Sequence, residues 1–137
     1  MRRFVLDSYA LLAQIQDEPG AAEVRTVLGE AATGKAEVFV SLINVGETLY
    51  HLERRRGASY VPEYLNLLEQ LPLALIEVTR ERVYEAAHLK ARYPISYADA
   101  FAAALAQELD AAMLTGDPEF RKLDTELRVQ WLPPRKR

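Results

Sequence analysis

The sequence predicts an α/β fold of three layers, in which a central, mostly parallel sheet lies between two layers of helices. Short and almost wholly apolar runs, such as residues 4–6 and 111–115, alternate with longer segments of helical periodicity. Strands that are separated by helices require crossover connections, and crossovers give parallel pairing. Strands with so few polar residues are typical of a sheet that is covered on both faces.

The elements follow from local signals along the chain. We expect strands at residues 4–6, 37–40, 73–78, 111–115 and 129–132. We expect helices at 8–16, 21–32, 42–56, 60–71 and 80–93, a helix opened by Ser96, and a short helix at 117–123. Gly57, Pro72 and Pro94 end three of these helices, because glycine favours a helix C-terminus and proline cannot continue a helix. Thr79 and Ser96 are suited to cap the helices that follow them.

The length of 137 residues suits one domain, which we place at residues 1–132, with 133–137 as a basic tail expected to be mobile. Half of the residues are hydrophobic and 27% are charged, as in soluble globular proteins. No apolar run approaches the roughly 20 residues of a membrane span, and the N-terminus lacks the pattern of a signal peptide. An intracellular, cytoplasmic location is therefore expected. The absence of cysteine excludes disulfides, thiolate metal sites and cysteine nucleophiles.

The net charge of −3 does not indicate a nucleic-acid-binding protein, since such domains are usually strongly basic. Basic residues do cluster at 54–56 and 135–137, and a solvated surface is the favoured interpretation of each run alone. An acidic pocket filled by metal ions would still allow the chain to bind a polyanion.

Asp99 is the only charged side chain between Arg92 and Glu108, in an alanine-rich stretch that is expected to pack closely as a helix. A buried, unpaired carboxylate would cost several kcal/mol. Asp99 therefore requires a counter-charge, a cation or a place at the end of the helix.

Three further acids hold comparable positions. Asp7 directly follows the first strand and Asp117 follows the fourth, so both are expected at the carboxyl edge of the sheet, where ligands of parallel α/β proteins bind. Asp99 lies in the first turn of its helix and can face the same edge. Glu47 lies farther along helix 42–56, on the face away from its apolar residues. The sequence predicts that the four acids converge.

Each acid also has a purely structural explanation. Asp7 is suited to cap the first helix, and Ser96 with Asp99 resembles a capping box, in which glutamate or glutamine is the usual partner. Asp117 precedes a proline, a common order at a helix N-terminus. Glu47 is equally consistent with an ordinary surface glutamate. No one of these explanations accounts for four acids at one edge.

Four converging carboxylates repel one another, and protons or cations must offset the repulsion. An all-oxygen ligand set favours Mg²⁺ or Mn²⁺ over zinc. Such a site can activate a bound water for in-line attack on phosphorus, which indicates phosphodiester hydrolysis. The four acids are thus the candidate catalytic and metal-binding residues. Ser8 and Thr115 are candidates for positioning a phosphate oxygen or a bound water, with a capping or turn role as the equal alternative.

Four segments in this order resemble the PIN-domain ribonucleases, in particular the VapC-type toxins of toxin–antitoxin pairs. They are residues 4–12 (FVLDSYALL), 44–48 (NVGET), 99–106 (DAFAAALA) and 114–120 (LTGDPEF). The ordered set is fairly specific and spans almost the whole chain. Tyr9 departs from the small residue often expected at its position.

The resemblance implies a compact α/β/α fold and Mg²⁺- or Mn²⁺-dependent cleavage of single-stranded RNA or structured RNA loops, leaving a 5′-phosphate and a 3′-hydroxyl. It also implies a homodimer and an inhibitory antitoxin protein as partner. By this likeness Asp7, Asp99 and Asp117 would bind the metal, while Glu47 would hold a metal-bound water or complete the metal shell.

Two alternatives remain open on the sequence. A phosphoacceptor receiver domain also has an acidic Mg²⁺ pocket, but it normally has two adjacent acids near the first strand and a lysine late in the chain. Here the first strand offers only Asp7, and no lysine directly follows the last strand. A catalytically silent PIN-like binding module is the other. The RNA target is not readable from the sequence: Tyr50, Tyr60, Tyr64 and Tyr97 are consistent with stacking on bases, but a core or interface role is favoured. Residues 54–56 either follow a phosphate backbone or contact an acidic segment of an antitoxin.

Overall fold

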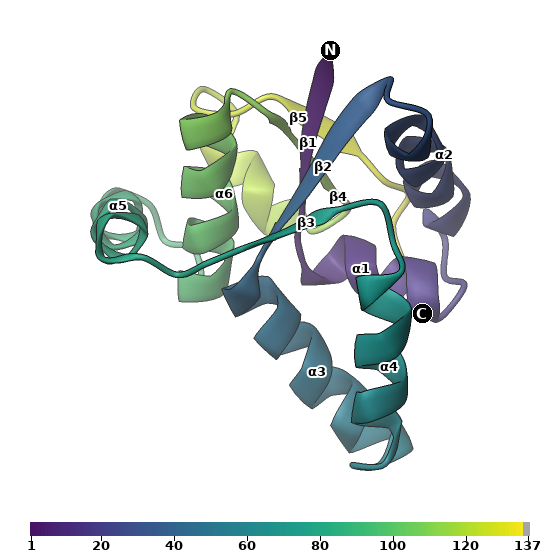
Figure 1. The fold of residues 1–137 in the computed structure, drawn as a ribbon. Helices are drawn as coiled ribbons and strands as arrows, with labels where there is room; N and C mark the ends of the chain where they lie inside the picture. The colour runs from purple at the N-terminus through teal and green to yellow at the C-terminus, as the bar shows by residue number, and fades with distance from the viewer. Residues whose placement is uncertain (136–137) are drawn as a thin grey trace.

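Five parallel strands in the order β3-β2-β1-β4-β5 form the centre of the protein (Figure 1). The structure is a computed structural model that describes residues 1–135. The strands are β1 (Arg2–Leu6), β2 (Ala36–Ser41), β3 (Ala74–Ile76), β4 (Ala112–Thr115) and β5 (Val129–Trp131). The helices are α1 (Ser8–Ile15), α2 (Ala21–Ala32), α3 (Leu42–Arg56), α4 (Tyr60–Glu69), α5 (Arg80–Arg92), α6 (Tyr97–Leu109) and the 3₁₀ helix η1 (Pro118–Leu123).

The predicted α/β class and the three layers are confirmed, and the sheet is wholly rather than mostly parallel. The third strand is shorter than the expected 73–78. It forms the edge of the sheet and pairs with β2 alone, so fewer residues are held in extended pairing. The expected helix at 60–71 ends earlier, at Glu69.

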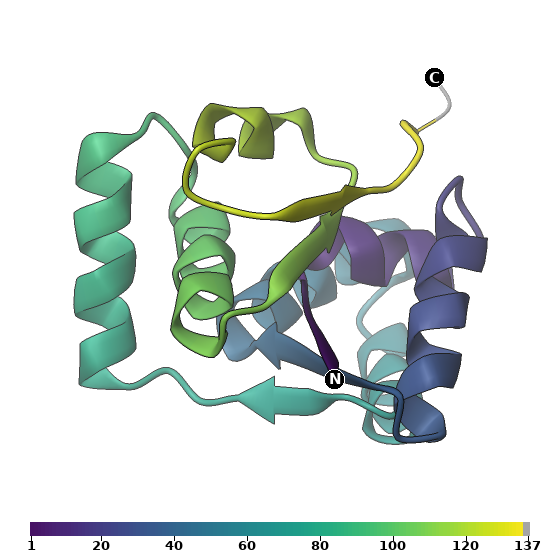
Figure 2. The ribbon, with the colours of Figure 1, turned by 90° about the horizontal axis from the view of Figure 1, so that it is seen from above.

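Alternation along the strands divides the core between the two faces of the sheet. Phe4 and Leu6 of β1 pack with apolar residues of α1, α2, α3 and α4 on one face, and Val5 packs with those of α6 and η1 on the other. The alanine-rich character of α6 lets it lie close to the sheet, and α5 packs outside α6 (Figure 2). Both faces are therefore covered, as the apolar strands require.

The register of the central strands positions the candidate site. Leu6 pairs with Leu114, so the residues that follow them, Asp7 and Thr115, lie side by side at the carboxyl edge. The α3–α4 hairpin projects beyond this edge of the sheet (Figure 1). Within residues 1–135, no helix has the length and apolarity that crossing a membrane would take.

The expected tail is described only in part, since residues 136–137 lie outside the described residues. Residues 133–135 are exposed and form no helix or strand. The Tyr9 hydroxyl donates to the Pro133 carbonyl oxygen at 2.9 Å, and the Arg135 guanidinium lies 4.3 Å from the centre of the Tyr9 ring. The start of the tail thus contacts the helix that follows Asp7.

Candidate metal centre

Asp7 is held at the end of β1 by bonds to both of its carboxylate oxygens. One oxygen accepts the Ala10 N–H at 3.1 Å and caps α1, and the other accepts the Thr115 hydroxyl at 2.6 Å. The side chain is almost wholly buried, with 1% of the residue exposed. The capping role expected as an alternative is therefore present, and it is compatible with a place in an acidic cluster.

Asp99 is buried in the first turn of α6, and its N–H donates to the Ser96 hydroxyl at 3.1 Å. In a capping box, the acid would bind the backbone N–H of the capping residue in return. Here Glu119 accepts the Ser96 N–H instead. Because Glu119 accepts this bond in place of Asp99, the carboxylate of Asp99 is free to face the other acids.

Asp117 caps η1 by accepting the Glu119 N–H at 2.9 Å, with a proline at the first helical position. Its own N–H donates to the Thr115 hydroxyl at 3.0 Å. The buried Thr115 hydroxyl therefore donates to Asp7 and accepts from Asp117, which joins two of the acids. Two roles were expected for Thr115. This geometry fits the turn role, and contact with substrate stays a prediction.

The three aspartates meet. Asp7, Asp99 and Asp117 each offer a carboxylate oxygen within 4.8 Å of those of the other two. None of the three forms an ion pair with a basic side chain within residues 1–135. Negative charge is thus concentrated in a largely buried site without a protein counter-ion.

The pKa values of Asp7 and Asp99 are both raised in this cluster. Burial and, to a smaller extent, the charge of Asp117 raise the pKa of Asp7 from 3.8 to about 7, although the bonds from Thr115 and Ala10 act to lower it. Burial, and then the charges of Asp117, Asp7 and Glu119, raise the pKa of Asp99 from 3.8 to about 8. Without a cation the site therefore retains protons near neutral pH. Carboxylate oxygens at this spacing, with no basic side chain paired to them in residues 1–135, fit a hard divalent cation such as Mg²⁺ or Mn²⁺.

Glu47 lies between Asp7 and Asp99 in the sequence. Its carboxylate is not among those that lie within 4.8 Å of one another. It is half-buried on α3 and accepts the Ser8 hydroxyl at 2.6 Å. Ser8 follows Asp7 directly, so this bond ties Glu47 to the rim of the cluster. Its expected part in the metal shell stays a prediction.

Sequence reasoning did not single out two residues that shape the site. Glu119 frees Asp99 by taking over the bond to Ser96, and its only sequence signal is its place two residues after Asp117. Asn44 is fully buried, and its side-chain amide donates to the carbonyl oxygen of Ala98 at 3.3 Å, next to Asp99. A buried asparagine three residues before Glu47 is a signal only once the packing of α3 on α6 is known.

Comparison with known proteins identifies the family to which the chain belongs. A family model for the PIN domain matches residues 4–126. The chain belongs to the PIN domain family. The three aspartates and Glu47 all lie within the matched residues of this PIN domain. A comparison with curated protein sequences gives no significant match.

Solved structures share the fold of this PIN domain at low sequence identity. VapBC2 of Rickettsia felis bound to a promoter DNA fragment matches with a TM-score of 0.74 at 14% identity, covering 96% of this chain and 99% of that chain. DNA-bound VapBC of Salmonella typhimurium matches with a TM-score of 0.74 at 17% identity, covering 95% and 98%. VapC20 of Mycobacterium tuberculosis, described as a toxin that cleaves the sarcin–ricin loop, gives 0.71 at 16% identity, covering 95% and 99%.

Proposed function

We propose that this PIN domain is a metal-dependent endoribonuclease that cleaves single-stranded RNA or structured RNA loops, and that it is the toxin of a toxin–antitoxin pair in the cytoplasm. The observation that carries the proposal is the convergence of Asp7, Asp99 and Asp117 without a basic partner. A merely structural cluster of caps would not need three carboxylates within reach of one ion, two of them buried. The activity is assigned to residues 1–132.

The three aspartates would hold Mg²⁺ or Mn²⁺ through their facing oxygens. A bound ion supplies an activated water and offsets the charge that builds on the phosphate. Thr115 and the Ala10 N–H fix the carboxylate of Asp7, so its orientation does not depend on the ion. Glu47, oriented by the Ser8 hydroxyl, offers a carboxylate at the rim that can hold a water and accept its proton.

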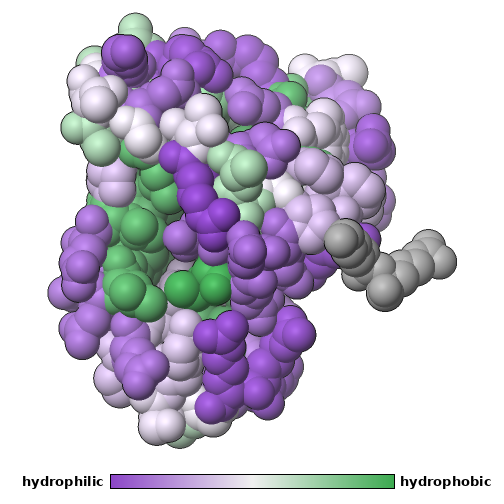
Figure 3. Space-filling model, turned by 90° about the vertical axis from the view of Figure 1, so that its right-hand side faces the viewer, coloured by the Kyte–Doolittle hydropathy of each residue, from purple (hydrophilic) through white to green (hydrophobic). Residues whose placement is uncertain are grey.

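An antitoxin protein is the partner proposed for the chain, and a homodimer is the proposed assembly. The Rickettsia and Salmonella structures are VapBC complexes, which supports the first of these. Hydrophobic residues gather on the side of the molecule opposite α5, between more hydrophilic ends (Figure 3). Apolar surface of this kind is typical of protein interfaces.

The alternatives differ in what supports them. The strand order β3-β2-β1-β4-β5 is not the 2-1-3-4-5 order of receiver domains, and the PIN match leaves that alternative without support. A catalytically silent PIN module shares the fold, and only an activity measurement separates it from a nuclease.

The test is cleavage of single-stranded RNA by the purified chain in Mn²⁺ or Mg²⁺. We expect cleavage that EDTA abolishes and that Asp7→Asn reduces by at least about a hundredfold, since the change removes a charge that must face the ion. Asp17→Asn, at an exposed aspartate just after α1, is the matched control and should cleave like the wild type. Cleavage that survives Asp7→Asn would point to a contaminant, and Mn²⁺ binding without cleavage would favour the silent module.

A further inference from the structure

A stripe of side chains on α3 begins at the acidic centre and runs outward along the projecting hairpin. Glu47, Tyr50, His51 and Arg54 are spaced three, four and seven residues from the first, so they share one face of the helix. The stripe spans about 10 Å along the helix axis. Its inner end is fixed to the centre, because Glu47 binds Ser8 and Ser8 follows Asp7.

Three side chains of this stripe, those of Tyr50, His51 and Arg54, lie against one another. The rings of Tyr50 and His51 lie 4.8 Å apart at 34°, and the Arg54 guanidinium lies 4.9 Å from the centre of the Tyr50 ring. Tyr50 is 47% exposed, and Arg54 is exposed. A guanidinium that lies over a ring keeps the N–H donors in its plane free for a phosphate.

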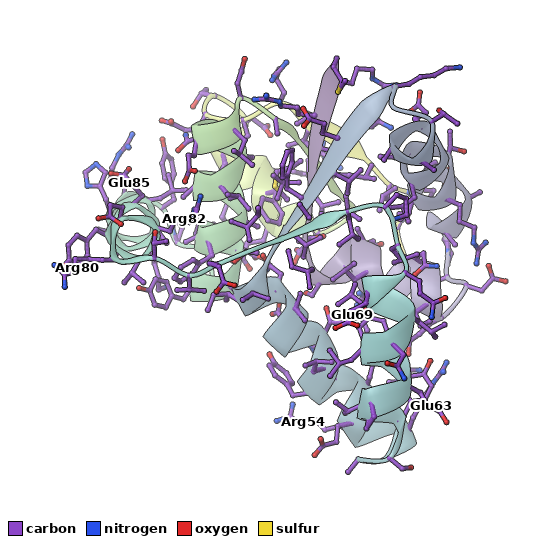
Figure 4. The ribbon with its side chains drawn as sticks, viewed as in Figure 1. Arg54, Glu63, Glu69, Arg80, Arg82 and Glu85 are labelled. Carbon is purple, nitrogen blue, oxygen red and sulfur yellow. The ribbon has the colours of Figure 1, made fainter. Side chains whose placement is uncertain are left out.

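Arg54 differs from most arginines of the described chain. Seven others pair with carboxylates within 4.0 Å, whereas Arg54 pairs with none in residues 1–135. Figure 4 shows Arg54 on the outer side of α3, with Glu63 of α4 on the opposite side of the hairpin. Its cation therefore has no protein partner on this face, and its only described contact of this kind is the tyrosine ring.

We propose that Tyr50, His51 and Arg54 form a binding track for single-stranded RNA that leads to the acidic centre. This rests on the proposed function, because it assigns the nucleotides next to the cleaved phosphate to the outer face of α3. Aromatic rings for stacking and cations for phosphates are the two parts of a single-strand binding site. An acidic protein segment would use the cation but has no base to stack on the ring, so RNA fits the track better.

The test separates binding from cleavage. Binding of a fluorescent single-stranded RNA to the EDTA-treated protein is measured by anisotropy over a range of salt concentrations. Arg54→Gln should lower the slope of log affinity against log salt by about 0.7, the value of one lost phosphate contact on a single strand. Tyr50→Ala should weaken binding at least about fivefold, whereas Tyr50→Phe should not, because the ring remains.

Arg80→Gln is the matched control, since Arg80 is also exposed and unpaired within residues 1–135 but lies at the far side of the molecule on α5 (Figure 4). It should keep the wild-type slope. In Mn²⁺, Arg54→Gln should raise KM for a long RNA, whereas Arg80→Gln should leave it at the wild-type value.

The results that would overturn the RNA-binding track differ from those that would overturn the nuclease activity. RNA cleavage with an unaltered salt slope in Arg54→Gln would overturn the track and keep the nuclease. RNA bound through Arg54 without cleavage would keep the track and overturn the nuclease. If a polyglutamate peptide binds and loses affinity in Arg54→Gln while the RNA curve does not move, the stripe is a protein-docking surface and the track is overturned.

Discussion

Gly116 is the residue of the site with the least room for a side chain. A Cβ at this position would overlap the ring of Tyr9, which is almost fully buried. The glycine lies between Thr115, which bonds Asp7, and Asp117, which faces the cluster. The tyrosine that is larger than expected from the family pattern thus occupies the space that the glycine leaves open.

Gly116→Ala should therefore displace the loop between β4 and η1. We expect a loss of about 1–3 kcal/mol in the free energy of unfolding, as for other overpacked sites, and weaker Mn²⁺ binding because Asp117 moves. Urea unfolding and calorimetric Mn²⁺ titration check the two effects. Gly29→Ala is the control, because nothing lies within 4 Å of the added Cβ on α2 and alanine favours the helix. If both variants had the same free energy of unfolding and the same Mn²⁺ affinity, the Tyr9 ring would move aside at little cost, contrary to this prediction.

At the residue scale, the sequence predicted only those site residues whose place in the chain fixes their place in the fold. Asp7 and Asp117 follow strands, and Asp99 opens a helix, so their meeting could be expected. The bonds of Glu119 to Ser96 and of Thr115 to Asp7 join residues 23 and 108 positions apart, and no local signal announces such contacts.

At the scale of elements, the packing of α3 on α6 sets the angle at which Asp99 enters the cluster. Asn44 makes a cross-helix bond to Ala98, and the Thr48 hydroxyl donates to the Asn44 carbonyl oxygen at 2.8 Å. Both side chains are fully buried. The start of α6 is thus held from outside its own helix.

Asn44→Ala should loosen this junction. We expect a loss of about 1–3 kcal/mol in the free energy of unfolding, because the Ala98 carbonyl oxygen loses a donor and a small cavity forms at the buried position 44. Mn²⁺ binding should weaken as Asp99 loses its fixed position. Asn66→Ala, on the exposed side of α4, should change stability by less than about 0.5 kcal/mol. Urea unfolding of both variants decides, and equal midpoints would show that α6 is positioned without Asn44.

Most elements could be predicted because caps, prolines and apolar runs are local. The edge position of β3 could not, since strand order depends on contacts between distant segments, and so its expected length of 73–78 was too great. The same holds for α5, whose sequence shows a helix but not that it packs outside α6.

For the whole molecule, the acidic centre links stability to pH. The raised pKa values of Asp7 (about 7) and Asp99 (about 8) mean that the folded state keeps protons that the unfolded state loses near pH 4. In metal-free protein, this contribution to the free energy of unfolding is full below about pH 4 and declines as pH rises, until it is lost above pH 8. Each group contributes a slope of at most about 1.4 kcal/mol per pH unit.

Urea unfolding of EDTA-treated protein should therefore show lower stability at pH 8 than at pH 5.5. Asp99→Asn removes one of these carboxylates, so it should flatten the decline and make the metal-free protein more stable at pH 8. Mn²⁺ should reverse the order of the two proteins, because the cation binds the ionised carboxylates and stabilises the wild type increasingly as pH rises. The exposed Asp17→Asn should follow the wild type throughout. A wild-type decline that Asp99→Asn leaves unchanged would place the titrating groups elsewhere in the protein and separate its pH response from the acidic centre.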